Sequence, residues 1–191
     1  MTRRFILATA LAVMVSPLAS AQPAAPASGS ELLLRPNVEG YVQGYQATDP
    51  NNGNRIFEYV LEGQTVQDWT EMLTLQDFPA SANVAPRAYF GTLGDFWLKS
   101  CPAGDVTVIH EAEENGYPVA VVQMICPNNP GTGKPEYAWM KGIQSGKSMY
   151  VVQKAFRFVP DREQITTWVR YLQKVTLCDE VGSKHPCPPL K

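Results

Sequence analysis

The sequence contains little histidine, and this limits the chemistry that one chain can perform. Only His110 and His185 occur among 191 residues, so a metal centre built from several histidines is excluded within one chain. The sequence also lacks the H-E-x-x-H motif of zinc proteases and the G-x-S-x-G motif of serine hydrolases, because Ser145 lies one place too late in Gly142–Gly146. We therefore expect no metal site and no complete hydrolytic set.

The nucleotide-binding loop motif is incomplete as well. The run Gly131–Lys134 is similar to the end of a phosphate-binding loop, but Asn128 replaces its first glycine. Pro135 stands where the motif needs a serine or threonine for magnesium. A turn-rich surface loop explains the run better, and we expect no cofactor.

Neither sign of charge is in large excess. Without Arg3 and Arg4 of the amino terminus, 14 of the 16 basic residues remain against 18 acidic residues, a net charge of −4. A chain balanced in this way has no basic surface that would attract nucleic acid or anionic lipid by charge alone. The composition excludes nucleic acid as an expected partner.

The amino terminus has the three parts of a secretory signal. Arg3 and Arg4 precede an apolar stretch over 5–15, and Ala19–Ala21 is a small-x-small cleavage site. The apolar stretch is shorter than the roughly 20 residues that a membrane-spanning helix needs. We predict a signal peptide over 1–21 that is cleaved after Ala21, a Pro/Ala/Ser-rich disordered linker over 22–30, and a periplasmic or secreted mature protein with no integral membrane segment.

The four cysteines of this exported chain predict disulfide bonds rather than free thiols or metal ligands. Three pairings are possible. We favour Cys101–Cys126 and Cys178–Cys187, because the second pair is close in sequence and borders a Pro-rich tail. On the chain-entropy model each bridge would add about 2–4 kcal/mol of stability.

The most regularly patterned stretch is Arg55–Phe78. Alternating residues over 55–61 predict a strand, and Gly63 permits a turn. The part over 66–76 fits either a strand or a helix capped by Thr65, and its β-branched and aromatic residues favour the strand. We interpret the stretch as two strands joined by a loop at Glu62–Asp68, with Trp69 as a core residue.

Further elements follow the same patterns. We predict a short edge element within 31–45, a helix over 84–100 capped by Asn83, two hairpins, and a helix capped by Asp161 that runs to about Leu177. The hairpins comprise 105–112 with 119–126, turning at Asn115-Gly116, and 136–144 with 148–158, turning at 145–147. In the last strand we expect one buried and one mixed face.

This order predicts an α+β domain over 31–180, with an antiparallel sheet of about six strands covered by two helices, and a Pro-rich tail over 181–191. The order resembles the Mog1/PsbP-like α/β sandwich, which also occurs among small exported bacterial proteins. The fragments Tyr59-Val60, Gly63–Val66 and Trp69–Met72 are similar to segments of uncharacterised exported proteins. The resemblance implies the fold and no particular activity.

Few residues stand out as functional candidates. His110 is the weak catalytic candidate, since it could meet a carboxylate on a neighbouring strand and act as a general base, although the adjacent Glu111 would point to the opposite face. Trp139 and Tyr137 beside the 127–135 loop, and Gln64 and Thr65 in the loop after 61, are candidate ligand or partner contacts.

Three functions remain open. The leading hypothesis is a non-enzymatic binding or accessory domain of the cell envelope, whose partner is an unknown envelope protein or small ligand. The alternatives are a periplasmic hydrolase that uses His110 with a carboxylate, and an assembly factor for an envelope complex. A pocket holding His110 and a buried carboxylate would favour the enzyme, an apolar groove would favour ligand binding, and a long unpaired edge strand would favour assembly.

Overall fold

The computed structural model describes residues 31–179 and 184–188. The predicted signal peptide with its cleavage site after Ala21, the linker over 22–30 and most of the tail over 181–191 lie outside these residues. Within the described residues the chain forms an α+β fold with two sheets, two α-helices and a short 3-10 turn.

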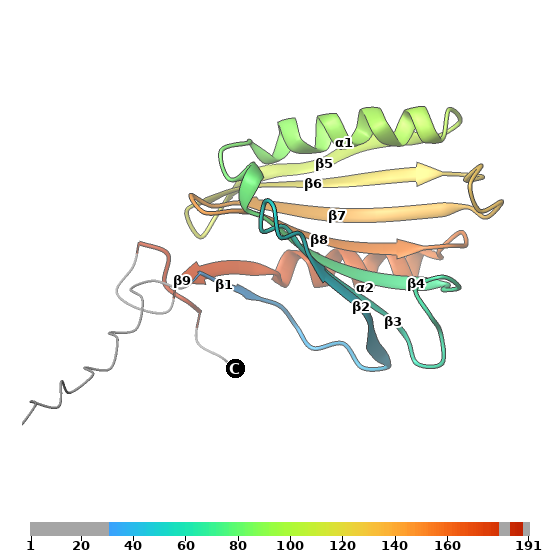
Figure 1. Cartoon of the computed structure of the whole chain (residues 1–191), viewed down its shortest axis with the longest axis horizontal. Coiled ribbons are helices and arrows are strands. Elements are labelled where there is room, and N and C mark those ends of the chain that lie inside the picture. Colours follow the sequence, from blue (N-terminus) through green and yellow to red (C-terminus); the bar gives the residue numbers. More distant parts are fainter. Residues whose placement is uncertain (1–30, 180–183, 189–191) are drawn as a thin grey trace, which may run out of the picture.

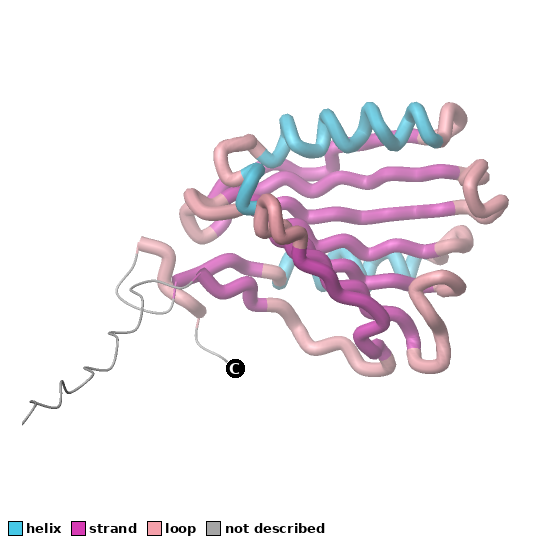
Figure 2. Tube along the Cα trace, in the orientation of Figure 1, coloured by secondary structure: helices cyan, strands magenta, loops and turns pink. Residues whose placement is uncertain are grey.

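The elements follow in the order β1 (Glu31–Leu34), β2 (Tyr41–Thr48), β3 (Arg55–Leu61), β4 (Glu71–Phe78), η1 (Pro79–Ser81), α1 (Pro86–Ser100), β5 (Asp105–Glu114), β6 (Tyr117–Cys126), β7 (Glu136–Gln144), β8 (Met149–Phe156), α2 (Arg162–Lys174) and β9 (Thr176–Asp179). Seven strands form the main sheet in the order β2-β3-β4-β8-β7-β6-β5, and all of its neighbours are antiparallel. Most of these strands are joined by short loops (Figure 2).

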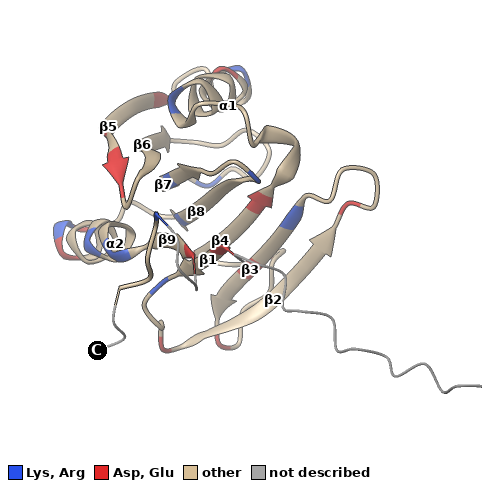
Figure 3. Ribbon diagram, turned by 90° about the vertical axis from the view of Figure 1, so that its left-hand side faces the viewer, with Lys and Arg blue, Asp and Glu red and all other residues tan. Residues whose placement is uncertain are grey.

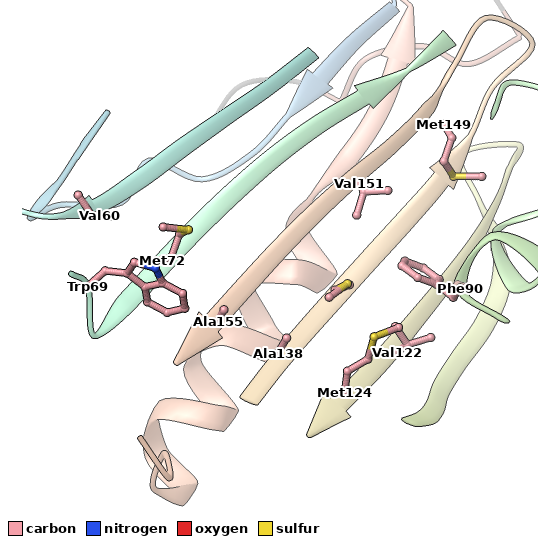
Figure 4. Close-up of a cluster of buried hydrophobic side chains, with 12 residues drawn as sticks. Val60, Trp69, Met72, Phe90, Val122, Met124, Ala138, Met149, Val151 and Ala155 are labelled. Carbon is pink, nitrogen blue, oxygen red and sulfur yellow. The ribbon is translucent and has the colours of Figure 1, made fainter. Parts of the chain in front are cut away.

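The two helices cover opposite faces of the main sheet (Figures 1 and 3). The face under α1 buries Phe90 against small and medium apolar side chains of the inner strands, among them Val122, Met124 and Ala138 (Figure 4). The face under α2 buries Trp168, Tyr171 and Leu172 of the helix against another apolar cluster. The sheet is therefore the middle of three layers, with a core on each side.

The regularly patterned stretch Arg55–Phe78 forms β3 and β4. The interpretation of its second half as a strand is confirmed from Glu71 onward. The loop between them is longer than predicted and includes Trp69, which is 5% exposed and packs into the α1-side core. Gln64 closes this loop by accepting from the Thr70 amide at 2.8 Å and donating to its hydroxyl at 2.8 Å.

The number of strands was underestimated. The predicted short element within 31–45 is in fact two strands, β1 and β2, and the sheet has seven strands instead of about six. β2 is the edge strand beside β3, and its register is irregular between Gln43 and Tyr45. β1 joins β9 in a separate two-stranded sheet.

The prediction of one buried and one mixed face for β8 was wrong, because β8 lies between β4 and β7 with a helix over each face of the sheet. Most of its residues on both faces are buried, including Lys154. β6 is enclosed between β5 and β7, and most of its residues are buried.

Each helix differs from the prediction at one end, α1 where it begins and α2 where it ends. α1 follows Ala85, with no side-chain cap, so Asn83 is not its cap. α2 has the predicted capping box of Asp161 and Gln164, but it ends at Lys174 instead of near Leu177. The residues after it leave the helix because Thr176–Asp179 pairs with β1.

Both disulfides have the pairing favoured from the sequence. Cys101–Cys126 joins the end of α1 to the end of β6, and Cys178–Cys187 joins β9 to the described part of the tail. His185 in that tail stacks on Tyr117 with ring centroids 4.2 Å apart, and its Nδ1 lies 2.7 Å from the Asn115 carbonyl. The described tail is thus held against the β5–β6 turn.

Candidate functional site

A β-bulge in β5 decides which side chains face each helix. Val108 is paired with Val122 and His110 with Val121, so Ile109 is an extra residue in β5. Val122 belongs to the core under α1 and Val121 packs in the core under α2. The bulge therefore turns His110 toward the α2 side of the sheet, whereas regular alternation from Val108 would have put it on the α1 side.

The neighbouring charges confirm this orientation. Glu111, whose side chain points to the opposite face from His110, forms an ion pair with Arg87 of α1 at 3.1 Å. Glu114 faces the α2 side and forms an ion pair with Lys141 of β7. His110 and Glu111 thus lie on opposite faces, as the sequence predicts.

A groove of about 250 Å³ opens between β5 and α2. Apolar side chains form its walls, and three polar ones and a histidine interrupt them. Its lining residues are Ile109, His110, Glu114, Val121, Lys141, Val169, Leu172 and Gln173. Figure 3 shows the end of β5 directed toward α2, and β5 is the edge strand of the sheet there.

The Lys141–Glu114 pair fixes the polar part of the groove. Lys141 is completely buried, and its Nζ donates to Glu114 Oε2 at 2.5 Å and to the Val175 carbonyl at 2.8 Å. Val175 is the C-cap of α2, so the ammonium stabilises the negative end of this helix and ties it to the sheet. The Glu114 side chain remains 32% exposed, and its second oxygen can accept a hydrogen bond from a ligand.

His110 lies exposed along the same groove. The carboxylate that shares the groove with it is Glu114, four residues further along the same strand, and not a carboxylate of a neighbouring strand as predicted. This carboxylate is already bound to Lys141. The lining residues include no serine, threonine or cysteine that could act as a nucleophile.

The other sequence candidates lie elsewhere. Trp139 is 2% exposed and packs edge-to-face on Phe156 in the core under α2, with ring centroids 6.0 Å apart. Tyr137 is half-buried on the same face. Gln64 and Thr65 belong to the β3–β4 loop, and the Thr65 hydroxyl accepts from the Asp68 amide at 3.2 Å. The structure therefore gives Trp139 a packing role and the two loop residues a loop-closing role.

A second groove, of about 330 Å³, lies between α1 and the segment that precedes it. It is lined by Ser81, Val84, Tyr89, Thr92, Leu93 and Phe96. No charged side chain lines it, and it has no set of converging polar groups that would orient a ligand. The groove at β5 is the better candidate because it combines apolar walls with a few fixed polar groups.

Residues 31–179 and 184–188 contain neither a metal-binding cluster nor a membrane-spanning helix. Within them no three His, Cys, Asp or Glu side chains are grouped closely enough to hold a metal ion. The same residues contain no helix that is long and apolar enough to cross a membrane.

Comparisons with known proteins give little. No family model matches the chain, and no curated protein matches it. Among solved structures, the chain is similar to LpqN, described as involved in cell envelope biogenesis of Mycobacterium tuberculosis. The TM-score is 0.39 and the identity 12%, over 81% of this chain and 86% of LpqN. A likeness of this size supports no conclusion about the fold or the function of this chain.

Sequence reasoning named His110 but missed the rest of the groove. Ile109 and Lys141 carried no recognisable signal, since the bulge depends on pairing with β6 and a lysine within a strand is typical of an exposed face. The one available signal was the Asn115-Gly116 turn, which fixes the position of Glu114 at the end of β5.

Proposed function

We propose that this protein is an exported, non-enzymatic binding module of the cell envelope, with the groove between β5 and α2 as its binding site. The observation that carries the proposal is a concave site whose apolar walls surround a fixed Lys141–Glu114 pair. Most binding sites for small molecules and anchoring side chains have this composition. The exported location rests on the predicted signal peptide over 1–21, and the two disulfides are compatible with an oxidising compartment.

The fold is part of the proposal too. We propose that 31–180 is a single domain of the Mog1/PsbP-like α/β sandwich type. An antiparallel sheet with one helix over each face supports this assignment. The tail over 181–191 remains a separate segment in this proposal, tied to the domain by Cys178–Cys187.

The binding function can be tested with two matched variants of α2. Val169→Glu places a charge in the groove wall, whereas Thr167→Glu places the same charge on an exposed position of the same helix. The mature protein and both variants would be immobilised and exposed to envelope extract, and the retained proteins and small molecules identified by mass spectrometry. We expect a species that wild type and Thr167→Glu retain and Val169→Glu loses. The same retained set for all three folded proteins would contradict the proposed site.

A hydrolase is the second candidate, because His110 and Glu114 line one groove. A histidine there could act as general base toward a water molecule. The variant His110→Gln separates the two functions, since it removes the base and keeps a polar side chain of similar length. If the mature protein hydrolyses chromogenic esters and His110→Gln abolishes the turnover, the non-enzymatic proposal is wrong.

A further inference from the structure

β5 is an end strand of the main sheet (Figure 1). In the described parts of the chain no strand pairs with its outer edge, although it is ten residues long. An edge of this kind presents unpaired backbone donors and acceptors that can bind an extended segment of another chain. The groove lies directly beside this edge, because Ile109, His110 and Glu114 of β5 form one of its walls.

The turn at the end of β5 shows which backbone groups point outward. Asn115 and Gly116 both have positive φ, 49° and 78°, as in a two-residue hairpin turn. The residues flanking such a turn, Glu114 and Tyr117, exchange hydrogen bonds with each other, and every second residue pair repeats this pattern. The amides of Glu113 and Glu111 consequently point to the free edge. Pro118, which is paired with Glu113, is consistent with this assignment, because proline has no N–H that could donate to Glu113.

The charge on β5 indicates the chemistry of the partner. The strand carries four carboxylates and no lysine or arginine: Asp105, Glu111, Glu113 and Glu114. Arg87 and Lys141 form ion pairs with two of them. The remaining excess of negative charge favours a segment that carries lysine or arginine.

The other free edge of the sheet lacks these features. β2 is eight residues long, has no charged residue, and has an irregular register between Gln43 and Tyr45. The bulge in β5 at Ile109 leaves the residues from His110 to Glu114 in unbroken register with β6. This regular segment borders the groove, so a strand could pair there and insert a side chain.

We propose that an extended segment of a partner protein, bearing lysine or arginine, adds to β5 as an eighth strand of the sheet. One apolar side chain of this segment enters the groove and packs against Ile109, Val169 and Leu172. The inference rests on the proposed function, for which it specifies the class of partner and the mode of binding.

The probe is a blocked nine-residue peptide that alternates lysine with valine and has leucine at its centre. Two comparison peptides carry either glutamate in place of every lysine or N-methyl groups on alternate backbone nitrogens. We expect the lysine peptide to slow hydrogen exchange at the amides of Glu111 and Glu113. Each comparison peptide should bind more weakly by about tenfold or more, because one loses the charge match and the other the strand hydrogen bonds.

Two variants at one position test the pairing from the protein side. Glu113→Pro removes an outward N–H at an edge position that tolerates proline, and Glu113→Gln loses the same charge while keeping the N–H. We expect Glu113→Pro to bind the lysine peptide about tenfold more weakly than Glu113→Gln does. Equal binding by the two variants would overturn strand addition.

The outcomes separate this inference from the proposed function. If the lysine and glutamate peptides protect β5 equally, the basic partner is wrong. If no peptide protects β5 while Val169→Glu still loses the captured species, strand addition is wrong and the binding site stands. If β5 stays unprotected and Val169→Glu retains the same species as wild type, both proposals are wrong.

Discussion

The two faces of the main sheet are built from different chemistry. The face under α1 is mainly apolar, since methionine, alanine and valine side chains surround Phe90 (Figure 4), and the polar side chain buried there, Thr74, is uncharged. The face under α2 holds two lysines, Lys141 of β7 and Lys154 of β8, and both side chains are completely buried. Adjacent strands of one sheet therefore bury charge on one face and exclude it from the other.

Each buried lysine has its own partners. Lys154 Nζ lies 2.6 Å from Glu71 and within 4.8 Å of the ring centroids of Tyr41, Phe156 and Trp168. The Tyr41 hydroxyl donates to Glu71 at 2.8 Å and accepts from Lys154. The aromatic faces and the carboxylate around this ammonium offset part of the hydration free energy that it loses on burial.

The different side chains buried on the two faces of the sheet determine how each helix is positioned. α1 is held by the apolar area that it buries and by the Cys101–Cys126 bridge. The Trp97 indole N–H also donates to the Ile125 carbonyl at 3.0 Å, and the ion pair of α1, Arg87–Glu111, is exposed. Contacts to α2 are also directional, since Lys141 donates to the Val175 carbonyl at its C-cap and Lys154 lies 4.2 Å from the Trp168 ring centroid. The helix that forms a wall of the groove is the one fixed by buried charges.

Moving a lysine to the apolar face should give the largest effect. Met140 of β7 is 3% exposed under α1, next to Lys141 in sequence but on the opposite face. Because Met140 packs among apolar side chains, Met140→Lys would bury an ammonium there and should destabilise the protein by about 5 kcal/mol or more. Chemical unfolding monitored by circular dichroism measures this, with Met140→Leu as control at a cost below about 1.5 kcal/mol. A lysine variant as stable as the leucine variant would show that the two faces do not differ.

Removing one partner of the Lys154 pair should have the next largest effect. Glu71→Ala leaves the ammonium buried without its carboxylate, and we expect a loss of about 3–5 kcal/mol in the free energy of unfolding. Replacing both partners, with Glu71→Leu and Lys154→Met, should bring the stability back to within about 1 kcal/mol of wild type or above it. A double variant as unstable as Glu71→Ala would mean that the pair itself, and not the orphaned charge, determines the loss.

Local signals explain most of what the sequence predicted correctly. The Asn115-Gly116 turn, the Asp161 capping box and the β3–β4 pair are set by residues close in the chain, and all three are present. β9 was missed, and β1 was not separated from β2, because β1 and β9 have no partners close in sequence: Leu32 pairs with Cys178. β2 was placed too short because its sequence, rich in glutamine and glycine, shows no alternation of apolar residues.

The candidate site was harder to predict than the fold. Its geometry depends on the bulge at Ile109 and on the packing of α2 against strands far from it in sequence. Lys141 and Lys154 look like exposed residues until their partners on other elements, Glu114 and Glu71, are in place. Sequence patterns report which residues alternate, and they do not report which charges meet.

The pH dependence of stability should give the smallest effect and the most specific one. Burial lowers the pKa of Lys154 from 10.5 to about 8, against the opposing influence of Glu71. Between these two values the unfolded chain binds more protons than the folded one, so stability rises with pH and is lost as pH falls through the folded pKa. From pH 7 to 9.5 we expect a gain of about 2 kcal/mol that the double variant at Glu71 and Lys154 lacks.

Above pH 10 the buried tyrosines act in the opposite direction: burial raises the pKa of Tyr117 to about 12, so its contribution is lost as pH rises. The measurement is therefore made below pH 10, by urea unfolding of both proteins at each pH. Parallel curves for wild type and the double variant would place the titration elsewhere, and the contrast between the two faces would then rest on packing alone.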